Sequence, residues 1–174
     1  MNWKFVEKVL IELSIPQKLR YIIMSSISSV RMRTTWNGHK GDYSNLKKGL
    51  KQGDPISPYL FVLCIDKLSH MIMDVEDNKE WEGMKVGRKG PKVSHMMFAD
   101  DLLLFGKATV QQITFITKVL TRFYGDSGQR SNVNNSTILL SKNTLLHIRK
   151  KIVQTLSLKE IMDLAMYLGV PLIV

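Results

Sequence analysis

The sequence predicts an α+β fold in which antiparallel hairpins alternate with helices, and three observations lead to it. Apolar side chains recur every three or four positions in residues 2–14 and again after Pro16, which is the period of amphipathic helices. The dipeptide Asn37-Gly38 tolerates the positive φ angles of a tight hairpin turn. Residues 95–105, "HMMFADDLLLF", place two aspartates between short apolar runs, which also indicates a hairpin. Helices and hairpins in this order favour α+β over a parallel βαβ array.

The first half of the chain is predicted in order as two helices, a hairpin and a long helix. The hairpin spans about residues 30–44, around the Asn37-Gly38 turn. Ser57 is predicted as the N-cap of the long helix and Pro58 as its first position, because proline has no N–H to lose there. Residues 58–73 are apolar on nearly every face, which predicts a buried helix.

The second half continues with a polar, turn-rich segment over residues 75–92, predicted as a surface loop with short strands. Helical spacing predicts a helix over 109–124 that ends near Gly125. Three further elements follow, namely a strand in "STILLS", a helix capped by Asn143, and a closing strand in "MYLGVPLIV".

Length and composition indicate one ordinary globular domain. The chain has 174 residues and is 44% hydrophobic, enough to build a single core. No stretch approaches the roughly 20 apolar residues of a membrane span, and the N-terminus lacks a signal-peptide pattern. We therefore expect a soluble intracellular protein without membrane contact, in a compartment that the sequence does not define. Cys64 lies in an apolar segment and is predicted to be a core residue, without a disulfide or zinc site.

The charge of the chain favours a polyanionic partner. The net charge is +10, from 25 Lys and Arg against 15 Asp and Glu. Residues 1–53 hold 10 basic and 3 acidic side chains, residues 54–106 hold 6 and 9, and residues 107–174 hold 9 and 3. An acidic middle with basic arms fits a phosphate-binding surface around a cation site. A basic protein with an uneven surface has the same pattern.

Asp100 and Asp101 form the first candidate site. Neighbouring strand residues point to opposite faces, so two adjacent aspartates share a side only where the chain turns. Apolar runs on both sides would anchor such a turn, and two hard oxygen donors suit Mg²⁺ bound together with substrate phosphates. The alternative is a solvated surface turn, where aspartate is common for its own hydrogen bonding.

The second candidate site is "QGDPISP", residues 52–58. Gly53 permits a strained dihedral or a close backbone approach, and the following helix presents unpaired N–H groups that suit phosphate. A plain helix-entry loop is the alternative. The two motifs together are more specific than either one alone.

"GLKQGDPISPYLF", followed by "HMMFADDLLLF" and later by "SGQ", "STILLS" and "YLGVPL", resembles the reverse transcriptases of non-LTR retrotransposons, especially the plant LINE type. The resemblance covers essentially the whole chain, and the order and spacing of QGDPxSP, FADD and YLGVPL are highly specific. It implies a right-hand polymerase palm with part of the fingers, an antiparallel sheet whose active-site β-hairpin is packed by helices.

The resemblance also implies roles for individual residues. Asp100 would be the main metal ligand of the palm hairpin and Asp101 its support, so both are the candidate catalytic and metal-binding residues. The residues expected at the template and incoming nucleotide are Gln52, Gly53, Phe98 and Ala99. The residues expected to grip the primer are Tyr167, Leu168 and Gly169.

By the same resemblance, the substrates are an RNA template, a DNA primer and a dNTP. A primer 3′-hydroxyl would attack the nucleotide α-phosphate in line, with two Mg²⁺ ions stabilising the attacking and leaving oxygens. Lys and Arg of the basic arms would bind the nucleic-acid backbones in a salt-sensitive way.

The chain departs from the family pattern in two places. The motif with another catalytic aspartate would precede Asn2-Trp3, so residues 1–174 are predicted as a partial reverse transcriptase domain that lacks this motif, the N-terminal fingers and most of the thumb. Asn135 stands where the family usually has a lysine. We therefore expect the isolated chain to be inactive as a polymerase. The alternatives are a non-catalytic nucleic-acid-binding remnant, a poorly folding pseudogene product, and activity restored by an N-terminal fragment supplied in trans.

Overall fold

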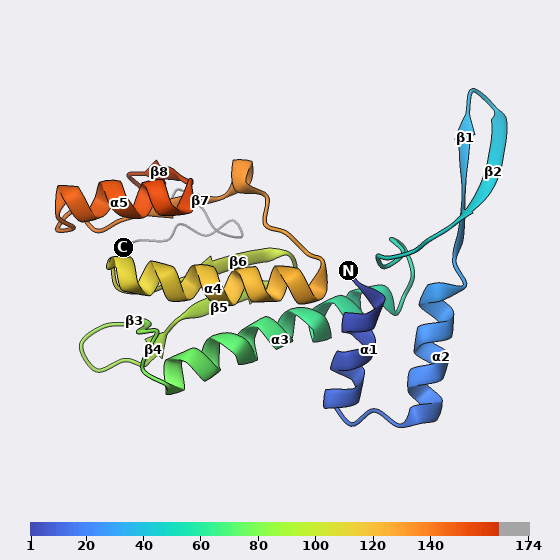
Figure 1. Cartoon of the computed structure of the whole chain (residues 1–174), viewed down its shortest axis with the longest axis horizontal. Coiled ribbons are helices and arrows are strands. Elements are labelled where there is room, and N and C mark those ends of the chain that lie inside the picture. The colour runs from blue at the N-terminus through green and yellow to red at the C-terminus, as the bar shows by residue number, and fades with distance from the viewer. Residues whose placement is uncertain (164–174) are drawn as a thin grey trace. The chain divides into compact units, whose positions relative to one another are not determined.

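Residues 1–163 are described by a computed structural model of the chain (Figure 1). They fall into two compact units, and each is described by itself. The first unit contains residues 1–70 and 122–129, and the second contains residues 71–121 and the chain from residue 130 onward. Two long helices contribute residues to both units. No helix within the described residues is long and apolar enough to cross a membrane.

The first unit is built from helices and one hairpin. Its elements are α1 (Trp3–Glu12), α2 (Gln17–Ser28), β1 (Arg31–Trp36), β2 (His39–Asn45), the start of α3 (Ser57–Asp77) and the end of α4 (Val110–Ser127). Its core consists of buried apolar side chains from these helices: Phe5, Val6, Val9, Leu10, Ile23, Ile27, Leu60, Cys64, Leu68 and Phe123. The two predicted N-terminal helices and the core position of Cys64 are thereby confirmed.

The predicted hairpin around Asn37-Gly38 is also confirmed. Asn37 has a φ of 46° and Gly38 a φ of 79°, so both turn residues adopt the left-handed backbone that a two-residue hairpin turn requires. Strands β1 and β2 pair antiparallel, with a register irregularity between Arg33 and Thr35. All thirteen residues of the two strands are exposed.

Helix α3 corrects two expectations. The helix begins at Ser57, so Ser57 is a helical residue and not the cap; its buried hydroxyl has no hydrogen-bond partner within residues 1–163. Burial is also one-sided, because Leu60, Cys64 and Leu68 are buried while Tyr59 is 72% exposed. The apolar composition of all faces therefore overstates how much of this helix the described chain covers.

The second unit combines short strands with helices. Its elements are the end of α3, β3 (Met84–Lys85), β4 (Lys92–Val93), β5 (His95–Phe98), β6 (Asp101–Leu104), the start of α4, the 3-10 helix η1 (Val133–Asn135), β7 (Thr137–Leu139), α5 (Leu146–Leu156) and β8 (Lys159–Ile161). The buried apolar side chains of this unit are Met71, Ile72, Trp81, Ile113, Ile116, Val119, Leu140 and Ile152. The predicted loop with short strands, the second hairpin and the strand in "STILLS" are all present.

Three details of the chain after residue 109 differ from the sequence prediction. Helix α4 continues through Gly125 to Ser127. Asn143 does not cap α5, which begins after Leu145 without a side-chain cap. Strand β8 was not predicted, and it pairs parallel with β7 after the crossover through α5. One βαβ connection thus occurs in a chain whose other described strand pairs are antiparallel.

The described strands form four separate two-stranded sheets, whereas one palm sheet was expected. The α+β class is retained, because helices and antiparallel hairpins make up most of the regular structure. The closing strand predicted in "MYLGVPLIV", which begins at Met166, lies outside the described residues.

Candidate active site

The two aspartates lie at the tip of the β5–β6 hairpin. Phe98 pairs with Asp101 at the end of the ladder, so Ala99 and Asp100 form a two-residue turn. Ala99 has a φ of 50°, a left-handed conformation that costs a residue with a Cβ about 1–2 kcal/mol. This strain is local to the turn that carries the carboxylates.

Both carboxylates are open to solvent. Asp100 lies in the turn and Asp101 is the first residue of β6, and both residues are exposed. Within residues 1–163, no hydrogen bond or ion pair engages either side chain. Their oxygens are hard donors that fit Mg²⁺, a cation usually held by one or two carboxylates together with phosphates. No set of three His, Cys, Asp or Glu side chains in the described chain is arranged to hold a metal ion.

The base of the hairpin is tied to the end of α3 by Ser94. The Phe105 N–H donates to the Ser94 carbonyl oxygen at 2.7 Å. The buried Ser94 hydroxyl donates to a Glu76 carboxylate oxygen at 2.5 Å and lies 2.9 Å from His95 Nδ1. Burial lowers the pKa of His95, and the neighbouring Glu76 carboxylate opposes that shift. The hairpin therefore starts from a fixed point on a long helix.

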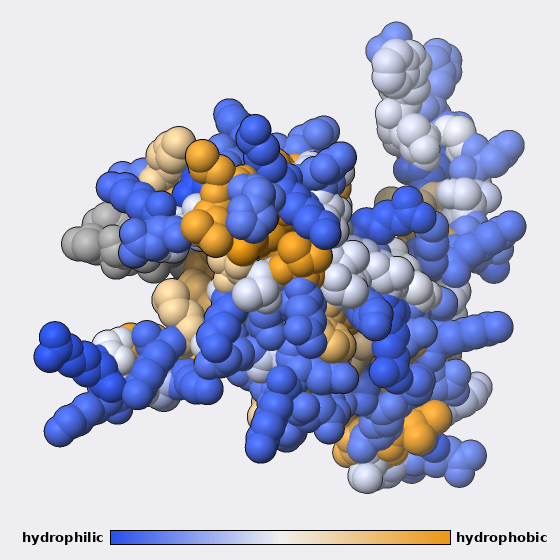
Figure 2. Space-filling model, turned by 60° about the vertical axis from the view of Figure 1, so that its left-hand side comes forward, coloured by the Kyte–Doolittle hydropathy of each residue, from blue (hydrophilic) through white to orange (hydrophobic). Residues whose placement is uncertain are grey.

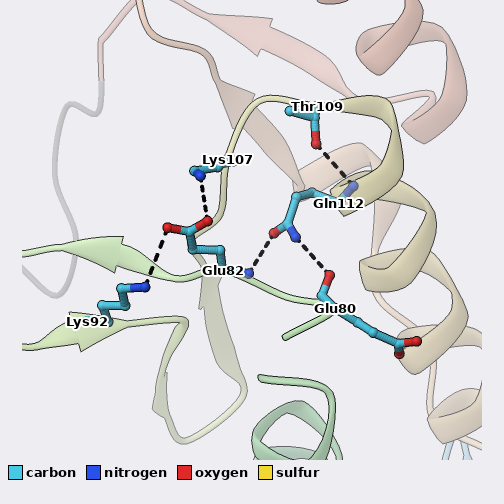
Figure 3. A network of polar contacts seen from close by, with 6 residues as sticks. All are labelled: Glu80, Glu82, Lys92, Lys107, Thr109 and Gln112. Atoms are coloured by element: carbon cyan, nitrogen blue, oxygen red, sulfur yellow. Dashed lines mark hydrogen bonds and ion pairs between the residues drawn. The ribbon is translucent and has the colours of Figure 1, made fainter. Parts of the chain in front are cut away.

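A second anchor joins the segment after α3 to the first turn of α4 (Figure 3). The Gln112 side chain accepts a hydrogen bond from the Glu82 N–H at 2.9 Å and donates one to the Glu80 carbonyl oxygen at 2.8 Å. Its own N–H donates to the Thr109 hydroxyl at 3.3 Å. Gln112 is 8% exposed, so both ends of this buried amide are satisfied by backbone.

Trp81 and Glu82 extend this anchor to the hairpin and the adjacent strand pair. The Trp81 side chain is 2% exposed, and its indole N–H donates to the Phe105 carbonyl oxygen at 2.8 Å. The Glu82 carboxylate pairs with Lys107 at 2.5 Å and with Lys92 at 3.4 Å, as Figure 3 shows. A hydrogen bond from Lys107 is the main cause that lowers the pKa of Glu82. Phe105 is thus held from both sides, at Ser94 and at Trp81.

Sequence reasoning missed these anchoring residues. Gln112 directly precedes the buried Ile113 in a segment that the sequence predicts only as an amphipathic helix. Trp81 is a large apolar residue in an otherwise polar segment, which was the available signal of a buried contact. Ser94 and Glu76 left no signal, because their hydrogen bond joins residues 18 positions apart.

The QGDPISP loop belongs to the first unit. Gln52 and Gly53 are exposed, and Gly53 has a φ of 83° with open space where a Cβ would lie. The Asp54 side chain accepts a hydrogen bond from the Ile56 N–H at 3.1 Å, which shapes the entry into α3. Before this loop, the indole N–H of Trp3 donates a hydrogen bond to the Gly49 carbonyl oxygen at 2.7 Å. The positive φ of Gly53 agrees with the backbone freedom expected of that glycine.

The remaining predicted residues divide into two groups. Phe98 and Ala99 lie beside the aspartates, and Phe98 is 61% exposed. Asn135 ends η1 and is exposed. The predicted primer-gripping residues Tyr167, Leu168 and Gly169 lie outside the described residues.

Residues 1–172 match the family model described as reverse transcriptase (RNA-dependent DNA polymerase). The chain belongs to the reverse transcriptase family. Two curated proteins match shorter segments. One is an uncharacterized mitochondrial protein of Arabidopsis thaliana, 43% identical over 54 residues, which are 31% of this chain and 44% of that protein. The other is the retrovirus-related Pol polyprotein from the type-1 retrotransposable element R2 of Popillia japonica, 34% identical over 82 residues, which are 47% of this chain and 12% of the polyprotein.

These matches confirm the family that the motifs predicted, the reverse transcriptases of non-LTR retrotransposons. The family implies a polymerase palm, and the described residues show mixed helices and small, mostly antiparallel sheets. Each aligned segment covers less than half the length of the curated relative that it matches.

Proposed function

We propose that this chain supplies the palm part of an RNA-directed DNA polymerase and that Asp100 and Asp101 are its metal-binding carboxylates. The observation that carries the proposal is the tip of the β5–β6 hairpin, where a two-residue turn brings both aspartates into solvent. Family membership supports the reaction class, and the net charge of +10 supports a nucleic-acid substrate.

The carboxylates act by holding Mg²⁺ beside the substrate phosphates. Bound Mg²⁺ supplies charge stabilisation for the attacking 3′-hydroxyl and the leaving pyrophosphate. Asp100 is the main ligand and Asp101 the supporting one. Ala99 and Phe98 fix the turn that presents them, and the anchors at Ser94 and Trp81 keep its base in place. Preorganisation of this kind favours catalysis because a misplacement of about 1 Å lowers the rate on the order of a hundredfold.

The remaining family roles concern the nucleic acid and nucleotide. Gln52 and Gly53 lie against the template and the incoming dNTP, where the positive φ of Gly53 leaves backbone without a side chain. Tyr167, Leu168 and Gly169 grip the DNA primer. Exposed Lys and Arg side chains neutralise phosphates of the RNA template and the primer, which makes binding sensitive to salt.

The two aspartates require a further carboxylate to hold both metal ions. Two-metal sites that join nucleotides need charge for two divalent cations, and the described residues contribute two adjacent carboxylates. Residues 164–174 contain no Asp, Glu, His or Cys. Residues 1–174 by themselves therefore bind template and primer without extending the primer, and a carboxylate from outside these residues completes the site.

Primer extension tests the need for a further carboxylate. Folded chain is incubated with an RNA template, a DNA primer, dNTPs and Mg²⁺, beside its Asp100→Asn variant. We expect no extension by either chain alone. Extension by the parent and none by Asp100→Asn would contradict the need for a further carboxylate, while assigning the chemistry to the hairpin.

A second candidate function follows from the charge distribution alone. A nucleic-acid-binding protein without catalysis would use the basic side chains of residues 1–53 and 107–174 and leave Asp100 idle. Divalent cations distinguish the two functions. If Asp100 holds Mg²⁺, the Asp100→Asn variant changes the Mg²⁺ dependence of template–primer binding; a protein that only binds nucleic acid shows the same dependence in both forms.

A further inference from the structure

The β1–β2 hairpin is a second candidate surface, separate in sequence from the aspartates. Every residue of both strands is exposed. Figure 1 shows the hairpin extending away from the end of α2, and Figure 2 shows the same projection in hydrophilic to neutral colours. A two-stranded hairpin without a packed face is only marginally stable in water. Because they are exposed, the side chains of this hairpin are available to a ligand. Binding of a ligand would stabilise the hairpin.

Pairing across the hairpin gathers three cations on one face. Directly opposed residues of an antiparallel pair share a face, and β1 places Arg31, Arg33 and Thr35 on the same side. Tyr43 pairs with Arg33, and Lys40 pairs with Thr35. Lys40 and Tyr43 are three positions apart and would lie on opposite faces of a regular strand. The register shift between these pairs brings both to the face of the arginines.

Arg33 and Tyr43 form a preordered contact on this face. The Arg33 guanidinium lies 5.1 Å from the centre of the Tyr43 ring, and its Nε donates a hydrogen bond to the Gly41 carbonyl oxygen at 2.8 Å. The Tyr43 residue is nevertheless 65% exposed. An exposed ring beside a fixed guanidinium is a platform on which a nucleobase can stack.

The charge around the hairpin selects a polyanion. Residues 30–51 contain six Lys and Arg against one acidic residue, Asp42. An acidic protein surface could satisfy the cations, but it would make no use of an open aromatic ring. A nucleic acid offers phosphates for the cations and base faces for the ring. Single strands fit best, because their bases are free to stack on side chains.

We propose that the face of the β1–β2 hairpin formed by Arg31, Arg33, Lys40 and Tyr43 binds single-stranded nucleic acid, with phosphates on the cations and a base on the tyrosine ring. The inference rests on the proposed function for the class of ligand, and it does not depend on Asp100 or on catalysis. Template and single-stranded primer share this chemistry.

The test measures binding of a fluorescent 12-nucleotide RNA to the full chain by anisotropy at several salt concentrations, with the matching DNA as a second probe. In one variant, Arg31, Arg33 and Lys40 become glutamine. The matched control replaces Lys85, Arg88 and Lys89, exposed cations of the β3–β4 hairpin, and removes the same charge. We expect the first variant to reduce the magnitude of the slope of log association constant against log salt by about 2, because each of its three lost phosphate contacts contributes roughly 0.7. The control variant should change this slope less.

The aromatic contact is tested separately. Tyr43→Leu should weaken RNA binding by about tenfold, while Tyr43→Trp should preserve it, because loss of one stacked base costs on the order of 1–3 kcal/mol. Tyr21→Leu is the control, since Tyr21 is an exposed tyrosine of α2. The RNA and DNA probes distinguish a template preference from a primer preference, and both support the site.

Three outcomes would overturn the inference. Equal effects of the hairpin triple variant and its control on RNA binding would show that the binding site is not on β1–β2. Equal competition by polyglutamate and by unlabelled RNA of the same charge, with Tyr43→Leu unchanged, would show recognition of charge alone. An absence of RNA and DNA binding by the parent chain at low salt would exclude the ligand. In the first two outcomes the proposed function still stands, because it depends on Asp100 and is read from the Mg²⁺ dependence of template–primer binding.

Discussion

Replacing Gln112 by leucine should break the anchor between the segment after α3 and the start of α4 and destabilise the chain. Its side-chain amide makes two hydrogen bonds to backbone, at 2.9 Å to the Glu82 N–H and at 2.8 Å to the Glu80 carbonyl oxygen. Each bond contributes about 1 kcal/mol net, and an orphaned buried group costs about 1–3 kcal/mol. Glu80 is exposed and Glu82 half-buried, so water recovers part of that cost. We predict a loss of about 2 kcal/mol in the free energy of unfolding.

Urea denaturation of the full chain measures this loss, and Gln111→Leu is the matched control. Gln111 precedes Gln112 on α4 and is exposed, so its replacement should change stability by less than about 0.5 kcal/mol. A second readout is the Trp81 indole N–H, whose exchange with solvent should accelerate in Gln112→Leu because the segment between Glu80 and Glu82 loosens. Equal stability of the two variants, with unchanged exchange at Trp81, would refute the assignment of this anchor.

Three further predictions concern single residues. Ser57→Ala should stabilise the chain by about 1 kcal/mol, measured by thermal or urea unfolding, because the buried Ser57 hydroxyl has no partner among the described residues; destabilisation would reveal a hidden partner. Ala99→Gly should also stabilise by about 1 kcal/mol, because glycine adopts the positive φ of this turn without strain, and a loss of stability would contradict that strain. Burial lowers the pKa of His95 against the opposing effect of Glu76, so the folded state resists protonation. The contribution of His95 to stability is therefore present above its unfolded pKa near 6.5 and is lost as the pH falls below that value. His95→Gln should flatten the pH dependence of the urea midpoint between pH 7 and pH 5. An unchanged pH dependence would argue against this role of His95.

Local patterns predicted the helices and hairpins because their causes are local. The apolar period of α1 and the positive φ angles of Asn37 and Gly38 require only neighbouring residues. The turn at Asp100 follows in the same way from two short apolar runs around a pair of charges. The family could also be predicted from the sequence, because the order and spacing of its motifs are properties of the sequence itself.

The remaining features depend on contacts between distant residues. Asn143 has the right chemistry for a cap, but α5 begins three residues later, at Leu146, and its buried residue is Ile152. The parallel pairing of β8 with β7 arises after a helical crossover and leaves no periodic signal in three residues. Ser94 and Gln112 anchor the hairpin through side-chain bonds that span 18 to 32 positions. The turn that carries Asp100 and Asp101 was therefore predictable from the sequence, while the residues that hold the hairpin in place were not.

Helix α3 shows why the apolar composition of a helix overestimates its burial. The apolar faces of α3 suggested a fully covered helix, but Tyr59 and Val62 remain exposed. Apolar composition reports what a helix can bury, whereas the neighbouring elements decide what it does bury. The acidic turn is simpler, because a carboxylate without a partner lies in solvent or on a cation.

The most direct test of the central claim is paramagnetic broadening of amide NMR signals by Mn²⁺, which takes the same hard oxygen ligands as Mg²⁺. The full 19.9 kDa chain is compared with Asp100→Asn and with Asp74→Asn, which removes an exposed carboxylate of α3 as a control. The account predicts selective broadening around Ala99 to Leu102 in the parent and in Asp74→Asn, and its loss in Asp100→Asn. Broadening centred elsewhere, or unchanged by Asp100→Asn, would contradict a metal-binding hairpin.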